Sequence, residues 1–253
     1  MIGAVIYKLC LDTIGMDYEI RVNDIIIDVG DDKSSIDVEY PINQYLIEGA
    51  NVITLQLIKE LDIDYSHKVS ILRADSNNYS INKTLNSFLI SPESLKTGLN
   101  IQTFNFFLKL PFKAADWVEC NKFDINNSTD YRLAKKIFLE YYNCLKTKNI
   151  LGILNISKHK NQNLIRPYNR DQDLYIENIK ISYAELLEDP DYRLWPLEEQ
   201  EIIPKLYGGG KLLKFVNEQN TSALIMFNES ESICSYYDIY IGKTKQDGIC
   251  IVL

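Results

Sequence analysis

The segment that most constrains the fold is Tyr131–Lys146, YRLAKKIFLEYYNCLK. Its apolar residues recur at the spacing of an amphipathic α-helix, so they form a stripe along one side. Three good N-cap residues, Ser128, Thr129 and Asp130, come directly before it. Lys146 complements the negative end of the helix dipole. Most other apolar runs are short or alternate, which favours strands. The sequence therefore predicts that this helix opens a second domain after a β-rich one.

The chain before the helix has the short runs and turn signals of an antiparallel sandwich. Tyr18–Val22 and Ile25–Val29 flank Asn23-Asp24, and these two residue types tolerate the positive φ of a hairpin turn. Residues 51–57 alternate apolar and polar, as in a half-buried strand. In residues 99–110 the even positions are mostly apolar, which predicts another strand of the same kind.

A polar segment, residues 121–130, marks the boundary between the two parts. We expect a β-rich α+β protein, with an antiparallel β-sandwich over residues 1–122 and an α+β domain over residues 123–253. In the second domain, helices come first and an antiparallel meander follows. The further helices are predicted at 150–156 and within 172–188, the polar stretch 157–163 is predicted as a loop that contains His159, and the strands are predicted at 211–216, 223–227, 233–241 and 248–253.

Two stretches resemble known folds. The first resembles jelly-roll modules such as the galactose-binding-like domains of glycosidases, through Val22-Asn23-Asp24-Ile25, Gln44-Tyr45-Leu46 and Gly49-Ala50-Asn51-Val52-Ile53. The second part of the chain resembles the nuclear-transport-factor-2-like cone fold. It does so through the order of its helices and through the run Lys211–Leu253. Enzymes of that family use an Asp-His pair or a Tyr-Asp set inside the cone. We see no residue here to which either role transfers.

Charge and composition narrow the functional classes. The net charge is −8, whereas nucleic-acid binders carry a basic face, so we expect no nucleic-acid partner and a basic protein partner instead. Two histidines and five cysteines without a CxxC pair do not supply ligands for a metal, and we expect no metal, cofactor or catalytic set. Gly208-Gly209-Gly210 lacks the Lys-Ser/Thr of a phosphate-binding loop and predicts a turn.

The remaining features indicate a cytoplasmic protein. The N-terminal segment lacks the basic region and long apolar run of a signal peptide. No run approaches the roughly 18 apolar residues that span a bilayer, so we expect no membrane partner. The cysteines lie in apolar contexts, which predicts buried thiols in a reducing compartment.

The segment Glu185–Glu201, ELLEDPDYRLWPLEEQE, combines acidic residues with aromatic ones. Acidic residues around aromatic anchors are typical of a surface that binds a basic protein. The alternative is a solvated helix end and loop, with Trp195 in the core. The predicted partner-binding residues are Glu188, Asp189, Asp191, Tyr192, Trp195, Glu198, Glu199 and Glu201.

In size, charge and expected folds, the chain resembles bacterial immunity proteins that neutralise secreted polymorphic toxins, including type VI and Rhs effectors. That resemblance implies a non-catalytic inhibitor that covers the basic active-site cleft of a cognate toxin. Two alternatives stay open. One is a small-molecule-binding or enzymatic protein of the nuclear-transport-factor-2-like type, and the other is a carbohydrate-binding or scaffolding module.

Overall fold

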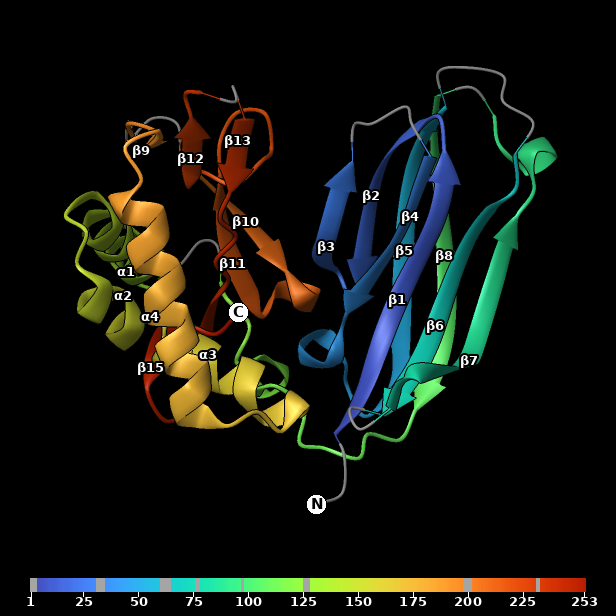
Figure 1. Ribbon diagram of the computed structural model, residues 1–253, viewed down its shortest axis with the longest axis horizontal. Coiled ribbons are helices and arrows are strands. Elements are labelled where there is room, and N and C mark those ends of the chain that lie inside the picture. The colour runs from blue at the N-terminus through green and yellow to red at the C-terminus, as the bar shows by residue number, and fades with distance from the viewer. Residues whose placement is uncertain are drawn as a thin grey trace. The chain divides into compact units, whose positions relative to one another are not determined.

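The computed structural model describes residues 4–30, 35–59, 65–75, 78–96, 98–124, 128–197, 202–230 and 233–253 (Figure 1). The chain divides into two compact units, Met1–Ala115 and Asp116–Leu253. The first unit consists of strands and short 3-10 turns, and the second contains the α-helices and the remaining strands. The β-rich α+β class is therefore confirmed. The division lies earlier than residue 122, and the buried Trp117 belongs to the second unit.

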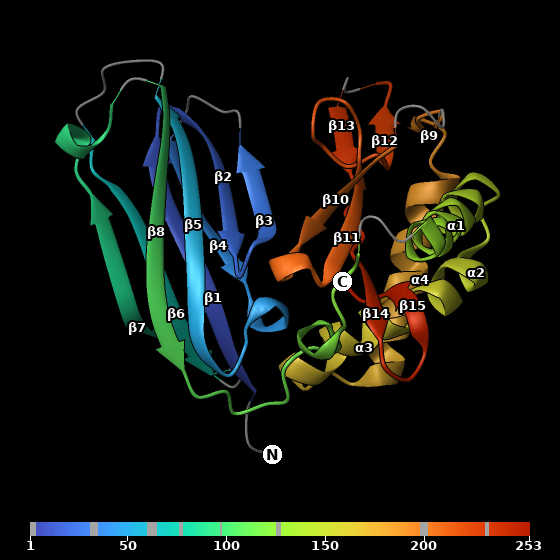
Figure 2. The ribbon, with the colours of Figure 1, turned by 180° about the vertical axis from the view of Figure 1, so that it is seen from behind.

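Within the described ranges, the first unit forms two four-stranded antiparallel sheets, ordered β4-β1-β6-β7 and β3-β2-β5-β8. The two sheets form two layers, and Figure 2 shows the layer with β5 and β8 from the other side. The strands are β1 (Val5–Ile14), β2 (Met16–Val22), β3 (Ile25–Gly30), β4 (Ser35–Pro41), β5 (Gly49–Lys59), β6 (His67–Asp75), β7 (Asn78–Ile90) and β8 (Gly98–Leu108).

Period-two alternation places one face of each sheet in a shared core. Ile53, Leu55 and Leu57 on β5 are fully buried, as predicted, and contributions from β1, β2 and β6 complete the core. On β8, Phe106 and Leu108 face inward while Phe107 is 75% exposed. Burial of each large aliphatic side chain contributes about 1.5–3 kcal/mol, so this interior is the main source of the unit's stability.

The predicted hairpin turn between β2 and β3 is confirmed. Asn23 and Asp24 have φ values of 51° and 64°, the left-handed conformation that a type I′ turn needs at both central positions. Arg21 supports the turn from one side, because its guanidinium contacts the Asp24 carboxylate at 3.0 Å.

The same asparagine turn precedes both β5 and β8. At the first, Asn51 Oδ1 accepts from the Ile47 N–H at 2.9 Å, and its Nδ2 donates to the Ile47 and Gly49 carbonyls, each at 3.0 Å. At the second, Asn100 makes the equivalent bonds with Lys96 and Gly98 at 3.0, 2.7 and 2.9 Å. The glycines have matching φ values of +95° and +96°, which favour glycine over other residues.

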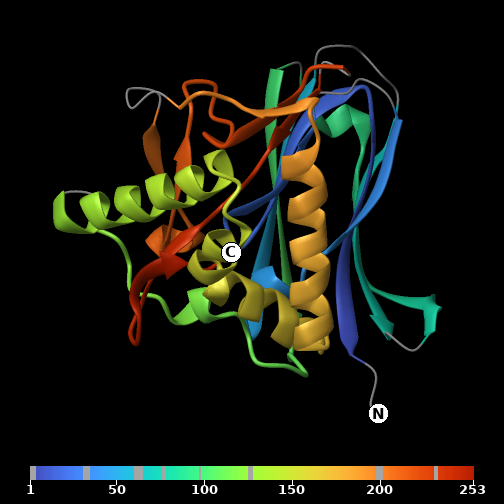
Figure 3. The same ribbon diagram turned by 60° about the vertical axis from the view of Figure 1, so that its left-hand side comes forward.

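The second unit contains helices α1 to α4, with α2 and α3 against α4 (Figure 3), and two antiparallel sheets ordered β10-β11-β14-β15 and β13-β12-β9 in the described ranges. The helices are α1 (Ser128–Lys146), α2 (Ile150–Ile156), α3 (Lys158–Ile165) and α4 (Gln172–Glu188). The strands are β9 (Tyr192–Leu194), β10 (Ile203–Tyr207), β11 (Leu212–Val216), β12 (Ile225–Asn228), β13 (Ile233–Tyr236), β14 (Ile241–Thr244) and β15 (Gly248–Ile251).

Most of the apolar stripe of α1 packs inward, as predicted, but Leu133 at its start is 44% exposed. Phe138 and Tyr141 are each 1% exposed, and the Phe138 ring lies 4.8 Å from that of Phe215 on β11. The predicted helices α2 and α4 are also confirmed. Each begins at a side-chain cap, because Asn149 accepts from the Gly152 N–H and Asp171 accepts from the Leu174 N–H.

Two expectations for the second unit are wrong. The stretch 157–163 is not a loop, because helix α3 begins at Lys158, Asn161 and Asn163 on it are buried, and the Asn163 side chain is hydrogen-bonded within the protein. The run 233–241 is not one strand. It divides into β13 and β14, which belong to different sheets. The helices-then-strands order is as predicted, with the strands distributed over two sheets.

We expect Asn51→Ala to lower the free energy of unfolding by about 3 kcal/mol, because it leaves three partly buried backbone groups of Ile47 and Gly49 without their partner. Asn51 is 0% exposed, whereas Asn100 makes the same local bonds near the surface. Asn100→Ala is therefore the matched control, with an expected loss of about 1 kcal/mol. Urea unfolding followed by tyrosine and tryptophan fluorescence measures both. Equal losses would show that burial of the Asn51 amide is unimportant.

Candidate functional site

The predicted acidic residues lie at the end of α4 and just beyond it. Glu188 is exposed in the last turn. Asp189 is the C-cap residue, in extended conformation before Pro190, and its carboxylate accepts from the Asp191 N–H at 2.9 Å. Asp191 is exposed, and its carbonyl accepts from the Glu229 N–H at 2.9 Å. Glu198, Glu199 and Glu201 lie outside the described residues.

The two predicted aromatic anchors have different surroundings. Tyr192 is half-buried and packs against the core of the second unit. Trp195 follows β9 and is 51% exposed, so the alternative of a core position for it is excluded. Its N–H donates to the Ile225 carbonyl at 2.8 Å, which continues the pairing of β9 with β12.

Strand pairing brings two further aromatic rings, the exposed Tyr236 and the half-buried Phe227, to Trp195. Tyr236, on β13, is opposite Ile225 and is 51% exposed. The Phe227 ring meets the Trp195 ring edge-on, with centroids 6.1 Å apart. We call Trp195, Ile225, Phe227 and Tyr236 the aromatic face. Sequence reasoning missed Phe227 and Tyr236, because only the register of three short strands brings them beside Trp195.

A hollow of about 320 Å³ adjoins the aromatic face. Trp195, Ile225 and Tyr236 line it together with the exposed Glu218, an acidic residue that the sequence analysis did not select. Arg193 on the neighbouring strand is paired with Glu229 at 3.1 Å, and both side chains are exposed, so this pair stabilises the fold little. The hollow thus combines aromatic walls with a negative charge, which suits a cationic side chain.

The cysteines differ in their exposure. All lie within the described ranges and are free thiols. Burial raises the pKa of Cys10 and of Cys120 to about 12 and that of Cys250 to about 11. Burial also raises the pKa of Cys144. Cys234 is exposed, opposite Phe227, so the prediction of a buried thiol there is wrong.

A second concavity, of about 350 Å³, lies between α2, α3 and α4, and we call it the helical pocket. Tyr175, Tyr183 and Tyr237 line it, and burial raises the pKa of each phenol, so these groups stay neutral at physiological pH. The Tyr183 hydroxyl is 2.7 Å from that of the deeper Tyr141.

Lys160, on α3, also lines the helical pocket. Within the described part of the chain, its ammonium has one polar contact, with the carbonyl oxygen of Asp238 at 3.4 Å. Desolvation by burial lowers the pKa of Lys160, and the Asp238 charge opposes that shift only in part. The Asp238 carboxylate itself is paired with Lys214 at 2.6 Å.

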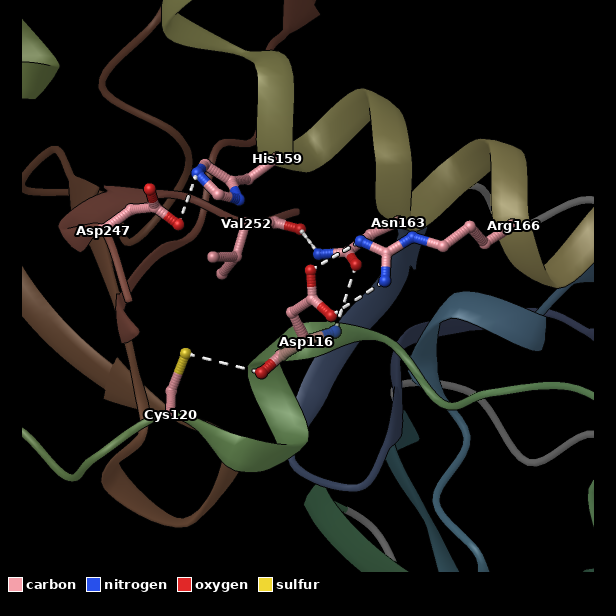
Figure 4. A network of polar contacts seen from close by, with 7 residues as sticks. All are labelled: Asp116, Cys120, His159, Asn163, Arg166, Asp247 and Val252. Atoms are coloured by element: carbon pink, nitrogen blue, oxygen red, sulfur yellow. Dashed lines mark hydrogen bonds and ion pairs between the residues drawn. The ribbon is translucent and has the colours of Figure 1, made fainter. Parts of the chain in front are cut away.

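The prediction that His159 lies in a loop is wrong, because the residue is on α3. Its Nε2 is 3.5 Å from a carboxylate oxygen of Asp247 (Figure 4). The Asp116 carboxylate accepts hydrogen bonds from both terminal nitrogens of Arg166, at 3.0 and 2.6 Å. Asn163 accepts from the Asp116 N–H at 3.0 Å and donates to the Val252 carbonyl at 2.8 Å. These bonds attach α3 and Arg166, which follows it, to the 3-10 turn Asp116–Glu119 and to Val252 after β15, which is a structural role.

No group of three or more His, Cys, Asp or Glu side chains lies close enough to hold a metal ion in the described part of the chain. None of the described helices is long and apolar enough to cross a bilayer.

We expect Lys160→Met to raise the melting temperature at pH 7, because it removes a poorly solvated charge. The pKa of Lys160 is lower in the folded than in the unfolded chain. The unfolded chain therefore binds more protons between these two values, and the cost of the charge falls as the pH rises through that interval. The advantage of the variant should shrink accordingly between pH 7 and pH 9.5.

Thermal unfolding at several pH values measures this difference. Lys158→Met, which changes an exposed lysine on the same helix, is the control and should leave the melting temperature unchanged. A lower melting temperature for Lys160→Met at every pH would contradict the assignment of Lys160 as a destabilising charge.

Comparisons of the chain with protein-family models, with curated protein sequences and with solved structures find no match. The likenesses to immunity proteins, to jelly-roll modules and to the cone fold therefore stay predictions.

Proposed function

We propose that this protein is a non-catalytic inhibitor that binds a basic protein through the aromatic face of its second unit. The observation that carries the proposal is the exposure of two large aromatic side chains, Trp195 and Tyr236, each 51% exposed on one small sheet. Clustered exposed aromatic rings mark interaction surfaces more often than isolated ones do. Trp and Tyr are also the residues that most often dominate binding energy at interfaces.

Charge around the aromatic face supports a basic partner. The exposed carboxylates of Glu188, Asp191 and Glu218 lie on the segments that flank it or line its hollow. A lysine or arginine of the partner that enters the hollow would gain both a carboxylate and a tryptophan face. The net charge of −8 adds long-range attraction, which accelerates association.

The class of partner that fits best is a cognate secreted bacterial toxin with a basic active-site cleft. A rigid aromatic surface with acidic surroundings can cover such a cleft and exclude its substrate without any chemistry of its own. Inhibition would then be stoichiometric, as in an immunity protein. The proposal assigns the first unit no part in this contact.

We expect the double variant Trp195→Ala/Tyr236→Ala to lose the partner that immobilised wild-type protein captures from a native lysate. Loss of one such anchor costs about 2 kcal/mol, so each substitution should weaken binding about 30-fold. Phe107→Ala is the matched control, because Phe107 is an exposed aromatic residue of the first unit. The captured protein should be basic, and its association should slow as salt is raised.

The purified partner decides the biological role. Its activity should fall to the background at one equivalent of wild-type protein, and the double variant should leave it active. Capture that is equally strong with wild-type protein and the double variant would refute the aromatic face as the binding surface. A partner that is captured through this face but stays fully active would refute the inhibitor role.

A further inference from the structure

The helical pocket has the construction of a small-molecule site and shares no lining residue with the hollow beside the aromatic face in the described chain. Its volume, about 350 Å³, lies in the range of ligand pockets. Leu154, Leu164, Ile179 and Leu186 supply apolar walls from three helices. Ligand sites commonly combine such walls with a few polar groups that fix orientation.

The Lys160 ammonium is the polar group that most needs a ligand. An ammonium has three donors, and within the described residues this one has only the long contact to the Asp238 carbonyl. Its natural counter-charge, the Asp238 carboxylate, lies 2.6 Å from Lys214 instead. An incompletely paired charge in a partly apolar pocket is costly, and an anion bound there would remove that cost.

The surrounding groups define the charge of the ligand. Among the described lining residues, none is acidic and Lys160 is the only one with a positive charge. The phenols of Tyr175, Tyr183 and Tyr237 and the hydroxyl of Ser182 are neutral donors or acceptors. One compact cation among neutral lining groups suits a monoanion, and the Arg170 guanidinium lies outside the lining, against the Tyr175 ring. Phosphate groups instead favour several donors or a planar guanidinium.

From this geometry we propose that the helical pocket binds a small amphiphilic monocarboxylate, with its apolar body between the helices and its carboxylate on the Lys160 ammonium. Aliphatic and aryl-substituted chains share this chemistry, so both are suitable probes. The site is independent of the proposed protein-binding function, since neither Trp195 nor Tyr236 lines it. Each can therefore fail without the other.

Isothermal titration calorimetry at pH 7.5 with octanoate and with 3-phenylpropanoate tests the proposal. We expect one site per chain for at least one of them. Octan-1-ol and octylamine have the same apolar body as octanoate without the carboxylate, and each should bind about tenfold more weakly or worse, as expected for loss of a charge-assisted hydrogen bond.

Three variants locate the site. Lys160→Met should weaken carboxylate binding about tenfold or more, whereas Lys158→Met, on the exposed side of the same helix, should leave it within about twofold. Ile179→Trp, which fills the apolar part of the pocket, should abolish binding of every probe. Circular dichroism checks that each variant is folded.

Three outcomes would overturn the proposal. The first is that neither carboxylate binds at 1 mM. The second is that octanoate and octan-1-ol bind with the same affinity, which would make the pocket a nonspecific apolar cavity. The third is that folded Lys160→Met binds the carboxylate as tightly as the wild-type protein does, which would place the ligand elsewhere.

Discussion

The side-chain amides of Asn23, Asn43 and Asn51 hydrogen-bond the turns and strand ends of the first unit to one another, and its fold depends on these bonds. Asn23 Nδ2 donates to the Tyr45 carbonyl at 2.9 Å and to Asn51 Oδ1 at 2.8 Å, while its Oδ1 accepts from the Val52 N–H at 3.0 Å. Asn43 accepts from the Tyr7 N–H at 2.7 Å and donates to the Val5 carbonyl at 2.8 Å. Buried backbone groups need such partners, so the turns and the two sheets are specified together.

Local periodicity was sufficient for the elements that depend on neighbours in sequence. The apolar spacing of α1, the cap of α2 at Asn149 and the Asn23-Asp24 turn are all local signals, and each was predictable. The helix α3 was not, because its polar Asn161 and Asn163 look like loop residues, and no local pattern reveals that both are buried. The three-residue strand β9 is too short to show alternation, and only its pairing with β12 defines it.

Local sequence patterns predict even less of the candidate sites than of the fold. The acidic residues after α4 could be found from composition, and so could Trp195. One side of the short strand β9 packs on the core, and this decides whether Trp195 or Tyr192 faces solvent. No local pattern reveals which side that is. Phe227 and Tyr236 reach Trp195 through strand register alone. Lys160 was missed because a lysine in a polar stretch is usually solvated, whereas here it lines a pocket between its own helix, α3, and the helices α2 and α4.

The contrast among the thiols has a practical consequence. A thiol reacts with electrophiles through its thiolate, and burial that raises the pKa of Cys10, Cys120 and Cys250 keeps that form scarce. Cys234, on β13 opposite Phe227, is instead exposed to solvent, so a reagent can reach it. A maleimide fluorophore would therefore attach there selectively, without engineered cysteines. The dye would sit beside the aromatic face and report directly, through its emission, on whatever comes to cover it.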